Sequence, residues 1–282
     1  HVEGALQEIA AFFAHVLLSI DERSIEKVAF DRQGEGGRVG QAYTLGMRRF
    51  LLAISLLLCP VVADASVTRL QIDRREVVLN GQPFGAAGPY EKLAGKVHFA
   101  LDPALPQNRG IVDLNLAPKN AQGMVEFSAD FYLLKPVDPS RGNGRLFYEA
   151  GNRGSKRILP VFQDAANSAD PSTKEEFGNG ALMRQGFTLL WMGWQWDVPE
   201  GRMRMDIPIA TENGKPLTGW VRGNFIPGTN LTSALIADRG HQPYPVVDPS
   251  GTEHRLLVRT LPTDPPREIA RATWRFTGPG TI

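Results

Sequence analysis

Cysteine is almost absent from this chain, whose 282 residues include a single one, Cys59. That residue falls in an apolar stretch near the N-terminus, and no cysteine follows it. A protein that begins after this stretch would have neither disulfides nor thiolate chemistry, so its stability would depend on its hydrophobic core. Paired cysteines for a zinc site are missing as well.

Charge of one sign is also lacking, because 31 Lys and Arg residues balance 30 Asp and Glu residues. Without a dense basic stripe the chain has no nucleic-acid footprint, and we expect no nucleic-acid partner. The three histidines beyond residue 65, His98, His241 and His254, are isolated from one another. With no H-E-x-x-H motif and no Asp-rich calcium loop, the sequence predicts no metal site. His98, on an alternating strand, is expected to be structural.

The apolar stretch that holds the cysteine has the layout of a secretory signal peptide. It begins at Met47 with an Arg pair, continues through an apolar run over residues 50–62 and ends in an A-x-A pattern at Ala65. We therefore predict a signal peptide over residues 47–65, cleaved after its last residue. The run is short for a membrane span, and Pro60 would break a core helix near its end.

A signal peptide that starts at residue 47 has consequences for the rest of the chain. Residues 1–46 become an upstream extension that is not part of the working protein. The protein itself is expected in the periplasm or outside the cell, with no membrane association beyond the signal peptide.

Residues 66–139 are predicted to form a β-rich N-terminal region. "VTRLQI", "REVVLN" and "KVHFALD" have strand character, and Asn80-Gly81 predicts a hairpin-type turn. The clearest alternation is in "MVEFSADFYLLKP", where apolar side chains from Val125 to Leu133 alternate with Glu126, Ser128 and Asp130. Such strands have one face in water.

Residues 140–202 follow a different pattern. "GRLFYEA" and "FTLLWMGW" are apolar on both faces, as buried parallel strands are. Between them, "RILPVFQDAA" predicts a helix that begins near Leu159, with Pro160 in its first turn, and "GNGALMRQG" predicts a short helix that ends at Gly186. Strand, helix and strand make one βαβ crossover. Residues 203–282 return to β-like sequence, with strand candidates in "MDIPIA", "GWVRGNFI", "HRLLVRTL" and "ATWRF".

The turn after "LFYEA" is the candidate site. Its four residues, Gly151, Asn152, Arg153 and Gly154, lie between a buried strand and a helix, where several backbone N–H groups converge. The glycine spacing fits neither a dinucleotide fingerprint nor a P-loop, so no nucleotide cofactor is predicted. Two interpretations of this turn remain: it is an oxyanion loop of an acyl-transfer enzyme, or it is a plain strand-to-helix turn.

The sequence offers no clear nucleophile, because a G-x-S-x-G elbow is absent. Ser155 lies in the candidate turn beside Lys156, but without an elbow around it. Asp248, Ser250 and His254 superficially suggest a triad, yet Asp-Pro-Ser-Gly is strong turn chemistry, and a turn is the better interpretation.

The aromatic cluster after the second buried strand has two interpretations. Trp191, Trp194 and Trp196 could line an apolar pocket, although strand packing is the usual reason for such a cluster. Asp197 could belong to a pocket rim, although a helix cap or a surface loop is the commoner role.

Three long segments carry a resemblance to a known family: "GPYEKLAGKVHFALDP", "IVDLNLAPKNAQGMVEFSADFYLLKPVDPSRGNGRLFYEAGNRG" and "GFTLLWMGWQWDV". They resemble the N-terminal part of a family of exported bacterial α/β-hydrolase domain proteins. The resemblance runs from about Val67 through "ATWRF", nearly the whole chain after the signal peptide.

This resemblance implies the α/β fold class, as an incomplete α/β-hydrolase fold with a β-rich N-terminal region and a β-rich insertion or cap over residues 203–282. It implies a serine hydrolase for carboxylic esters or related acyl compounds, without a cofactor. The nucleophile elbow, acid and histidine would lie in a C-terminal half that this sequence does not contain. By position, Gly151, Asn152, Arg153 and Gly154 correspond to the family's N-R-G turn and to the oxyanion loop.

Two expectations about partners and activity follow from the resemblance. The partners would be a small acyl substrate and the missing half of the same protein, and the 282-residue chain alone would be inactive. The alternative is an exported, non-catalytic β-rich module that binds a ligand or packs on a partner domain.

Overall fold

The computed structural model describes residues 66–226, 231–237 and 240–282. The predicted upstream extension, residues 1–46, and the predicted signal peptide, residues 47–65, lie outside the described residues. Within the described ranges, no helix has the length and apolar character needed to cross a membrane.

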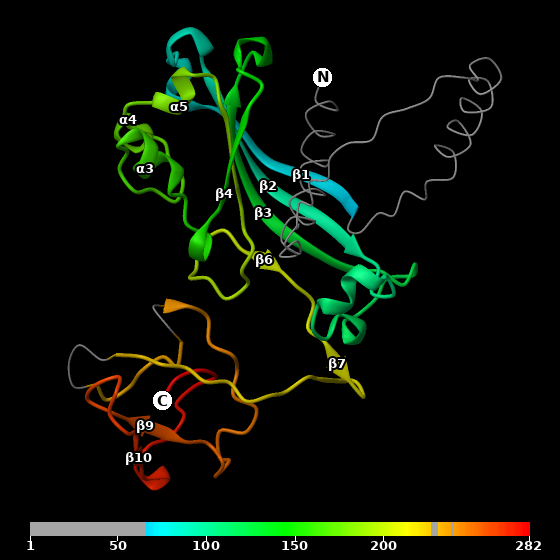
Figure 1. The fold of residues 1–282 in the computed structure, drawn as a ribbon, viewed down its shortest axis with the longest axis vertical. Coiled ribbons are helices and arrows are strands. Elements are labelled where there is room, and N and C mark those ends of the chain that lie inside the picture. Colours follow the sequence, from blue (N-terminus) through cyan, green and yellow to red (C-terminus); the bar gives the residue numbers. More distant parts are fainter. Residues whose placement is uncertain (1–65, 227–230, 238–239) are drawn as a thin grey trace, which may run out of the picture.

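A six-stranded mixed sheet dominates the fold (Figure 1). Its strand order is β1-β2-β3-β5-β4, and β6 pairs with β3 beyond the end of β5. The β4–β5 pair is parallel, whereas β1–β2, β2–β3, β3–β5 and β3–β6 are antiparallel. The strands are β1 (Ser66–Val77), β2 (Tyr90–Leu101), β3 (Val125–Pro136), β4 (Leu146–Ala150), β5 (Thr188–Met192) and β6 (Met205–Asp206).

Short helices connect and cover the sheet. The α-helices, α3 (Ile158–Gln163), α4 (Lys174–Phe177) and α5 (Ala181–Arg184), lie together on one face (Figure 1). The 3-10 helices are η1 (Val78–Gly81), η2 (Gly85–Ala87), η3 (Pro106–Gly110), η4 (Leu114–Leu116), η5 (Pro139–Arg141), η6 (Asn152–Gly154) and η8 (Arg271–Thr273).

The predicted βαβ crossover is confirmed, because β4 and β5 pair in parallel with α3, α4 and α5 between them in the chain. The helix α3 begins at Ile158, which leaves Pro160 in the first turn, where its missing N–H costs nothing. The helix α5 ends at Arg184, and Gly186 follows with a φ of 79° that favours glycine.

The predicted fold class is wrong. The structure is β-rich, with a largely antiparallel mixed sheet and three α-helices of six, four and four residues in its described part, so it is not an α/β-hydrolase fold. The first three strands, β1, β2 and β3, have 12 residues each and pair in succession as an antiparallel meander. Most strand pairs of the sheet are therefore antiparallel, and only β4–β5 is parallel. The predicted hairpin at Asn80 is wrong as well, because β1 pairs with β2 and Asn80 lies in η1.

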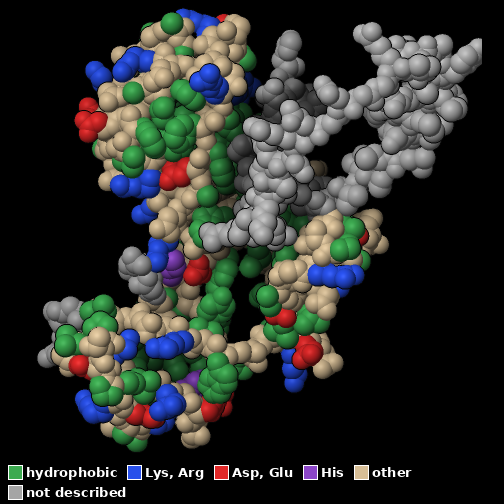
Figure 2. Space-filling model, in the orientation of Figure 1, with side chains coloured by type: hydrophobic (Ala, Val, Ile, Leu, Met, Phe, Trp, Pro, Cys, Tyr) green, Lys and Arg blue, Asp and Glu red, His purple; other side chains and the backbone are tan. Residues whose placement is uncertain are grey.

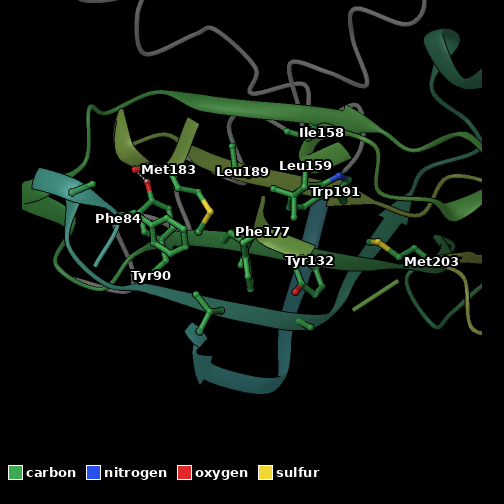
Figure 3. Packing of buried hydrophobic residues seen from close by; sticks show 14 residues of the cluster. Phe84, Tyr90, Tyr132, Ile158, Leu159, Phe177, Met183, Leu189, Trp191 and Met203 are labelled. Atoms are coloured by element: carbon green, nitrogen blue, oxygen red, sulfur yellow. Dashed lines mark hydrogen bonds between the residues drawn. The ribbon is translucent and has the colours of Figure 1, made fainter. Parts of the chain in front are cut away.

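The main core lies between the sheet and the helices (Figure 3). Trp191 and Phe177 are fully buried there, and the hydroxyl of Tyr90 donates to the carbonyls of Met183 and Phe187, both at 2.9 Å. A second apolar cluster, which includes Phe99, Phe131 and Leu190, occupies the opposite face of the sheet. The two clusters together bury both faces of the central strands.

This packing corrects the expectation of one wet face for β3. Alternation places Tyr132 and Leu134 on the same face as Ser128 and Asp130, yet both belong to the core under the helices. The face is therefore apolar where the helices cover it and polar further along the strand.

The C-terminal segment contains little regular structure and forms a separate lobe, visible in the ribbon (Figure 1) and in the space-filling view (Figure 2). Its strands are short: β7 (Thr211–Glu212), β8 (Lys215–Pro216), β9 (Leu256–Val258) and β10 (Arg267–Ile269). "MDIPIA" contains only the two residues of β6, "GWVRGNFI" contains no strand, and "ATWRF" begins in η8. Local alternation was insufficient here, because a strand needs a partner for its backbone groups.

Candidate functional site

The candidate turn lies where the two parallel strands end. Because β4 and β5 are parallel, the loops that follow them, Gly151–Gly154 and the segment 193–198, emerge at the same edge of the sheet. Arg153 and Gly154 adopt left-handed conformations, with φ of 55° and 67°. A Cβ atom on Gly154 would collide with the carbonyl oxygen of Met203, so this close approach requires glycine.

The backbone N–H groups of Arg153 and Gly154 in this turn, and of Ser155 directly after it, have acceptors inside the protein. Gly154 N–H donates to Gly151 O and Ser155 N–H to Asn152 O, both at 3.2 Å. The Arg153 N–H donates to the side-chain oxygen of Gln195 at 2.8 Å. An acyl oxygen could use the Arg153 N–H only by displacing the Gln195 amide, so the oxyanion role of the turn stays a prediction.

A carboxylate, an imidazole and a guanidinium meet beside this turn. Arg153 Nη1 lies 2.6 Å from His241 Nε2, and His241 Nδ1 lies 3.2 Å from Asp197 Oδ2. Because a guanidinium can only donate, Nε2 accepts and the ring proton is on Nδ1, where it points to the carboxylate. This assignment makes His241 a neutral imidazole held by Asp197.

Backbone and aromatic contacts also join the segment 193–198 to the C-terminal lobe. The Gln242 N–H donates to the carbonyl of Asp197 at 2.8 Å, and the rings of Trp196 and Tyr244 pack edge to face with centroids 5.0 Å apart. His241 is only 7% exposed, whereas the Asp197 side chain is about one-third exposed. The C-terminal lobe thus contacts the sheet edge through His241.

Sequence reasoning did not find this cluster. The sequence places Asp197 on a pocket rim or, more commonly, in a helix cap or surface loop, and it leaves His241 isolated. The two are 44 residues apart, and only the fold brings them together. The available signal was the position of Asp197 just after a buried strand, where ligand-binding residues of parallel strands gather.

Ser155 and Lys156 point to different surroundings. The Ser155 hydroxyl donates to Asn152 O at 2.7 Å, within the turn. The Lys156 ammonium is buried: it donates to the carbonyl of Ala169 and lies 4.4 Å from the centroid of the Tyr132 ring. Burial lowers the pKa of Lys156 to about 8. Lys156 therefore belongs to the core and is not directed at Ser155.

The second serine candidate lies in a turn, as predicted. Both the backbone N–H and the hydroxyl of Ser250 donate to the Asp248 carboxylate, at 2.9 and 2.6 Å, and Gly251 N–H donates to Asp248 O. His254 Nε2 contacts the backbone carbonyl of Asp248 at 2.7 Å. The Asp248 carboxylate stabilises a turn by accepting from Ser250, and His254 contacts neither this carboxylate nor the Ser250 hydroxyl in the hydrogen bonds given above, so the three residues do not form a catalytic triad.

The tryptophans have separate environments. Trp191 is fully buried in the core, where its Nε1 donates to Glu149 at 2.6 Å. Trp194 is half exposed and donates to Gly151 O at 2.9 Å, which fixes the start of the candidate turn. Trp196 packs on Tyr244, so the three tryptophans do not line one pocket together.

No cluster of three or more His, Cys, Asp or Glu side chains in the described ranges has the arrangement of a metal site. His98 lies on β2, where its Nε2 is 2.8 Å from Arg69 Nη2.

Comparisons of the chain with protein-family models, curated proteins and solved structures find no match.

Proposed function

We propose that this chain forms part of the active site of an exported hydrolase for carboxylic esters or related acyl compounds. The observation that carries the proposal is the meeting of Arg153, Asp197 and His241 at the carboxyl edge of the parallel strands β4 and β5. This edge is where open sheets with parallel strands bind ligands. A neutral histidine held by a carboxylate can act as the general base that activates a hydroxyl nucleophile in ester hydrolysis.

Each residue would have a distinct role. Asp197 orients the imidazole, and His241 Nε2 takes the proton of the attacking hydroxyl group. The turn Gly151–Gly154, with the Arg153 guanidinium, would face the acyl oxygen as negative charge develops on it. The nucleophilic serine would come from the C-terminal half that the resemblance implies, because among the described residues His241 contacts Arg153 and Asp197 and no serine hydroxyl.

In this conformation Arg153 occupies the acceptor atom of His241, so catalysis would require the guanidinium to move towards the substrate. That contact favours a second candidate function. If Arg153 stays in place, the cluster only holds the C-terminal lobe on the sheet, and the protein is an exported module that binds a ligand or packs on a partner domain.

The two candidates differ in their reaction with a fluorophosphonate probe. The complete protein should be labelled and should hydrolyse p-nitrophenyl esters, whereas the 282-residue chain alone should show no hydrolysis above background. His241→Gln and Asp197→Asn should each lower kcat by at least 100-fold, in keeping with the loss of a general base. Active-site-dependent hydrolysis by the 282-residue chain alone would contradict the placement of the serine.

Matched substitutions control for folding and surface charge. His254→Gln and Asp248→Asn change another neighbouring histidine and aspartate, in the exposed turn, and should leave kcat unchanged. Absence of labelling in the complete protein, with unchanged melting temperatures, would reject the hydrolase and favour the non-catalytic module.

A further inference from the structure

A groove of about 380 Å³ lies on the sheet, outside the cluster around His241. Its walls come from β1, β2, β3 and β6, and it is lined by Thr68, Arg69, His98, Phe99, Glu126, Phe127, Ser128 and Asp206. It occupies the polar continuation of the face that the helices cover further along β3. The volume lies within the range of small-molecule sites.

Polar side chains form a row across four strands at the floor of the groove. Arg69 pairs with His98 in the β1–β2 register, His98 with Ser128 in the β2–β3 register, and Ser128 with Asp206 in the β3–β6 register. Neighbouring side chains in such a row lie about 5 Å apart. The register shift between Val67 and Arg69 bends β1 at one end of this row.

Hydrogen bonds within the row leave capacity for a ligand. Arg69 Nη2 lies 2.8 Å from His98 Nε2, and the Ser128 hydroxyl donates to Asp206 at 3.3 Å. A guanidinium has five N–H donors, and a carboxylate accepts about four hydrogen bonds. Burial, followed by the charges of Arg69 and Lys96, lowers the pKa of His98, so its ring is uncharged at neutral pH and accepts from Arg69.

The charges of the groove disfavour ions of either sign. Asp206 and Glu126 repel an anion, while Arg69 and the nearby Lys96, which forms ion pairs with Asp206 and Asp130, repel a cation. An apolar acyl chain or aromatic ring would cover these groups without pairing them, which is costly. A ligand that both donates and accepts at closely spaced positions avoids these penalties.

We propose that this groove binds a neutral polyhydroxylated ligand, a saccharide unit, through Arg69, Ser128, Glu126 and Asp206. Vicinal hydroxyl groups would donate to the two carboxylates and to the serine oxygen, and would accept from the guanidinium. The groove proposal is independent of the proposed hydrolase, because the two sets of residues do not overlap.

The test is saturation-transfer difference NMR on the full chain, with cellobiose as the neutral probe and butyrate and inorganic phosphate as the apolar and anionic probes. Cellobiose should receive saturation at millimolar concentration. Arg69→Gln and Glu126→Gln, both at exposed positions, should each weaken its binding about tenfold. Glu212→Gln on β7 and Arg222→Gln in the segment 217–226 should leave it unchanged.

Two variants on different strands, Arg69 on β1 and Glu126 on β3, keep the test informative if one of them fails to fold. Loss of the cellobiose signal in Arg69→Gln or Glu126→Gln, with thermal melting unchanged, supports the groove. Absence of any cellobiose signal, a signal that both variants retain, or binding of phosphate or butyrate in its place would overturn the proposal.

Discussion

At the scale of single residues, Lys156 is the least expected feature of the structure. It follows the candidate turn directly, yet its ammonium is 8% exposed and lies over the ring of Tyr132. Burial accounts for the lowered pKa, and the charge of Asp170 partly opposes it, with Arg74 and Arg202 acting in the same direction as burial. A charge in this place costs stability whenever the amine is protonated.

The stability of the protein should therefore rise between about pH 8 and pH 10.5. Over this range the folded protein has released the Lys156 proton, with a pKa of about 8, whereas the unfolded chain keeps it until about pH 10.4. Because the unfolded state binds more protons there, the free energy of unfolding increases with pH, by roughly 2–3 kcal/mol from this group. Urea unfolding at pH 7, 8, 9 and 10 measures the increase.

The variant Lys156→Met should remove this pH dependence. It should be at least as stable as the parent at pH 7, because the loss of one hydrogen bond, worth about 1 kcal/mol, is smaller than the cost of the buried charge. Lys119→Met, at an exposed lysine, should keep the parent's pH profile. A Lys156→Met protein whose stability still climbs from pH 8 to pH 10 would show that another group titrates.

At the scale of elements, one carboxylate joins the crossover helix to the sheet. Glu149, near the end of β4, accepts hydrogen bonds from the backbone N–H groups of Arg157 and Ile158, at 2.8 and 2.9 Å. The same oxygen accepts from Trp191 Nε1 on β5 at 2.6 Å. The start of α3, which has no capping side chain of its own at Arg157, is thus satisfied by the neighbouring strand.

Substitution of this carboxylate should loosen the whole crossover. Glu149→Ala leaves the buried indole N–H and two helix N–H groups without an acceptor, so we expect the free energy of unfolding to fall by about 2–4 kcal/mol. Trp191→Phe in the Glu149→Ala background should cost less than in the parent, because the indole N–H no longer has a partner to lose. Urea denaturation of the two single variants and the double variant measures this coupling, with exposed Glu212→Ala as the control. Additive effects would contradict the shared contact.

The sequence predicted what is local in these elements and missed what is not. The crossover from β4 to β5 follows from two doubly apolar runs and a helix with Pro160 in its first turn, all within about fifty residues. The fold class was wrong because periodicity does not report the direction in which strands pair. The contact of His241 with Asp197 was missed for the same reason: it depends on where the C-terminal lobe lies, and no local pattern encodes that position.

At the scale of the whole molecule, the two parts of the chain differ sharply in burial. The sheet and its helices contain nearly all of the buried apolar side chains, from Val78 to Met203. In the C-terminal lobe, Trp220 and Ile226 are 81% and 97% exposed. Backbone hydrogen bonds of Ala234 and Ile236 with the segment 280–282 hold parts of the lobe together. Such a difference in packing predicts a large difference in local stability.

Limited trypsin digestion should expose this difference. We expect an early cut after Arg222, which is exposed and lies in a segment without regular structure, whereas cuts in β1, β2 and β3 should require global unfolding. Mass spectrometry over a time course would identify the cuts. The variant Arg222→Gln should delay the loss of the intact chain without changing its melting temperature.

Early cleavage at Arg74 or Lys92, which form ion pairs on the sheet, would show that β1 and β2 open as readily as the lobe. Proteolysis of fast-opening segments follows the equilibrium population of the open form, so the ratio of early to late cuts measures the stability gap between lobe and sheet.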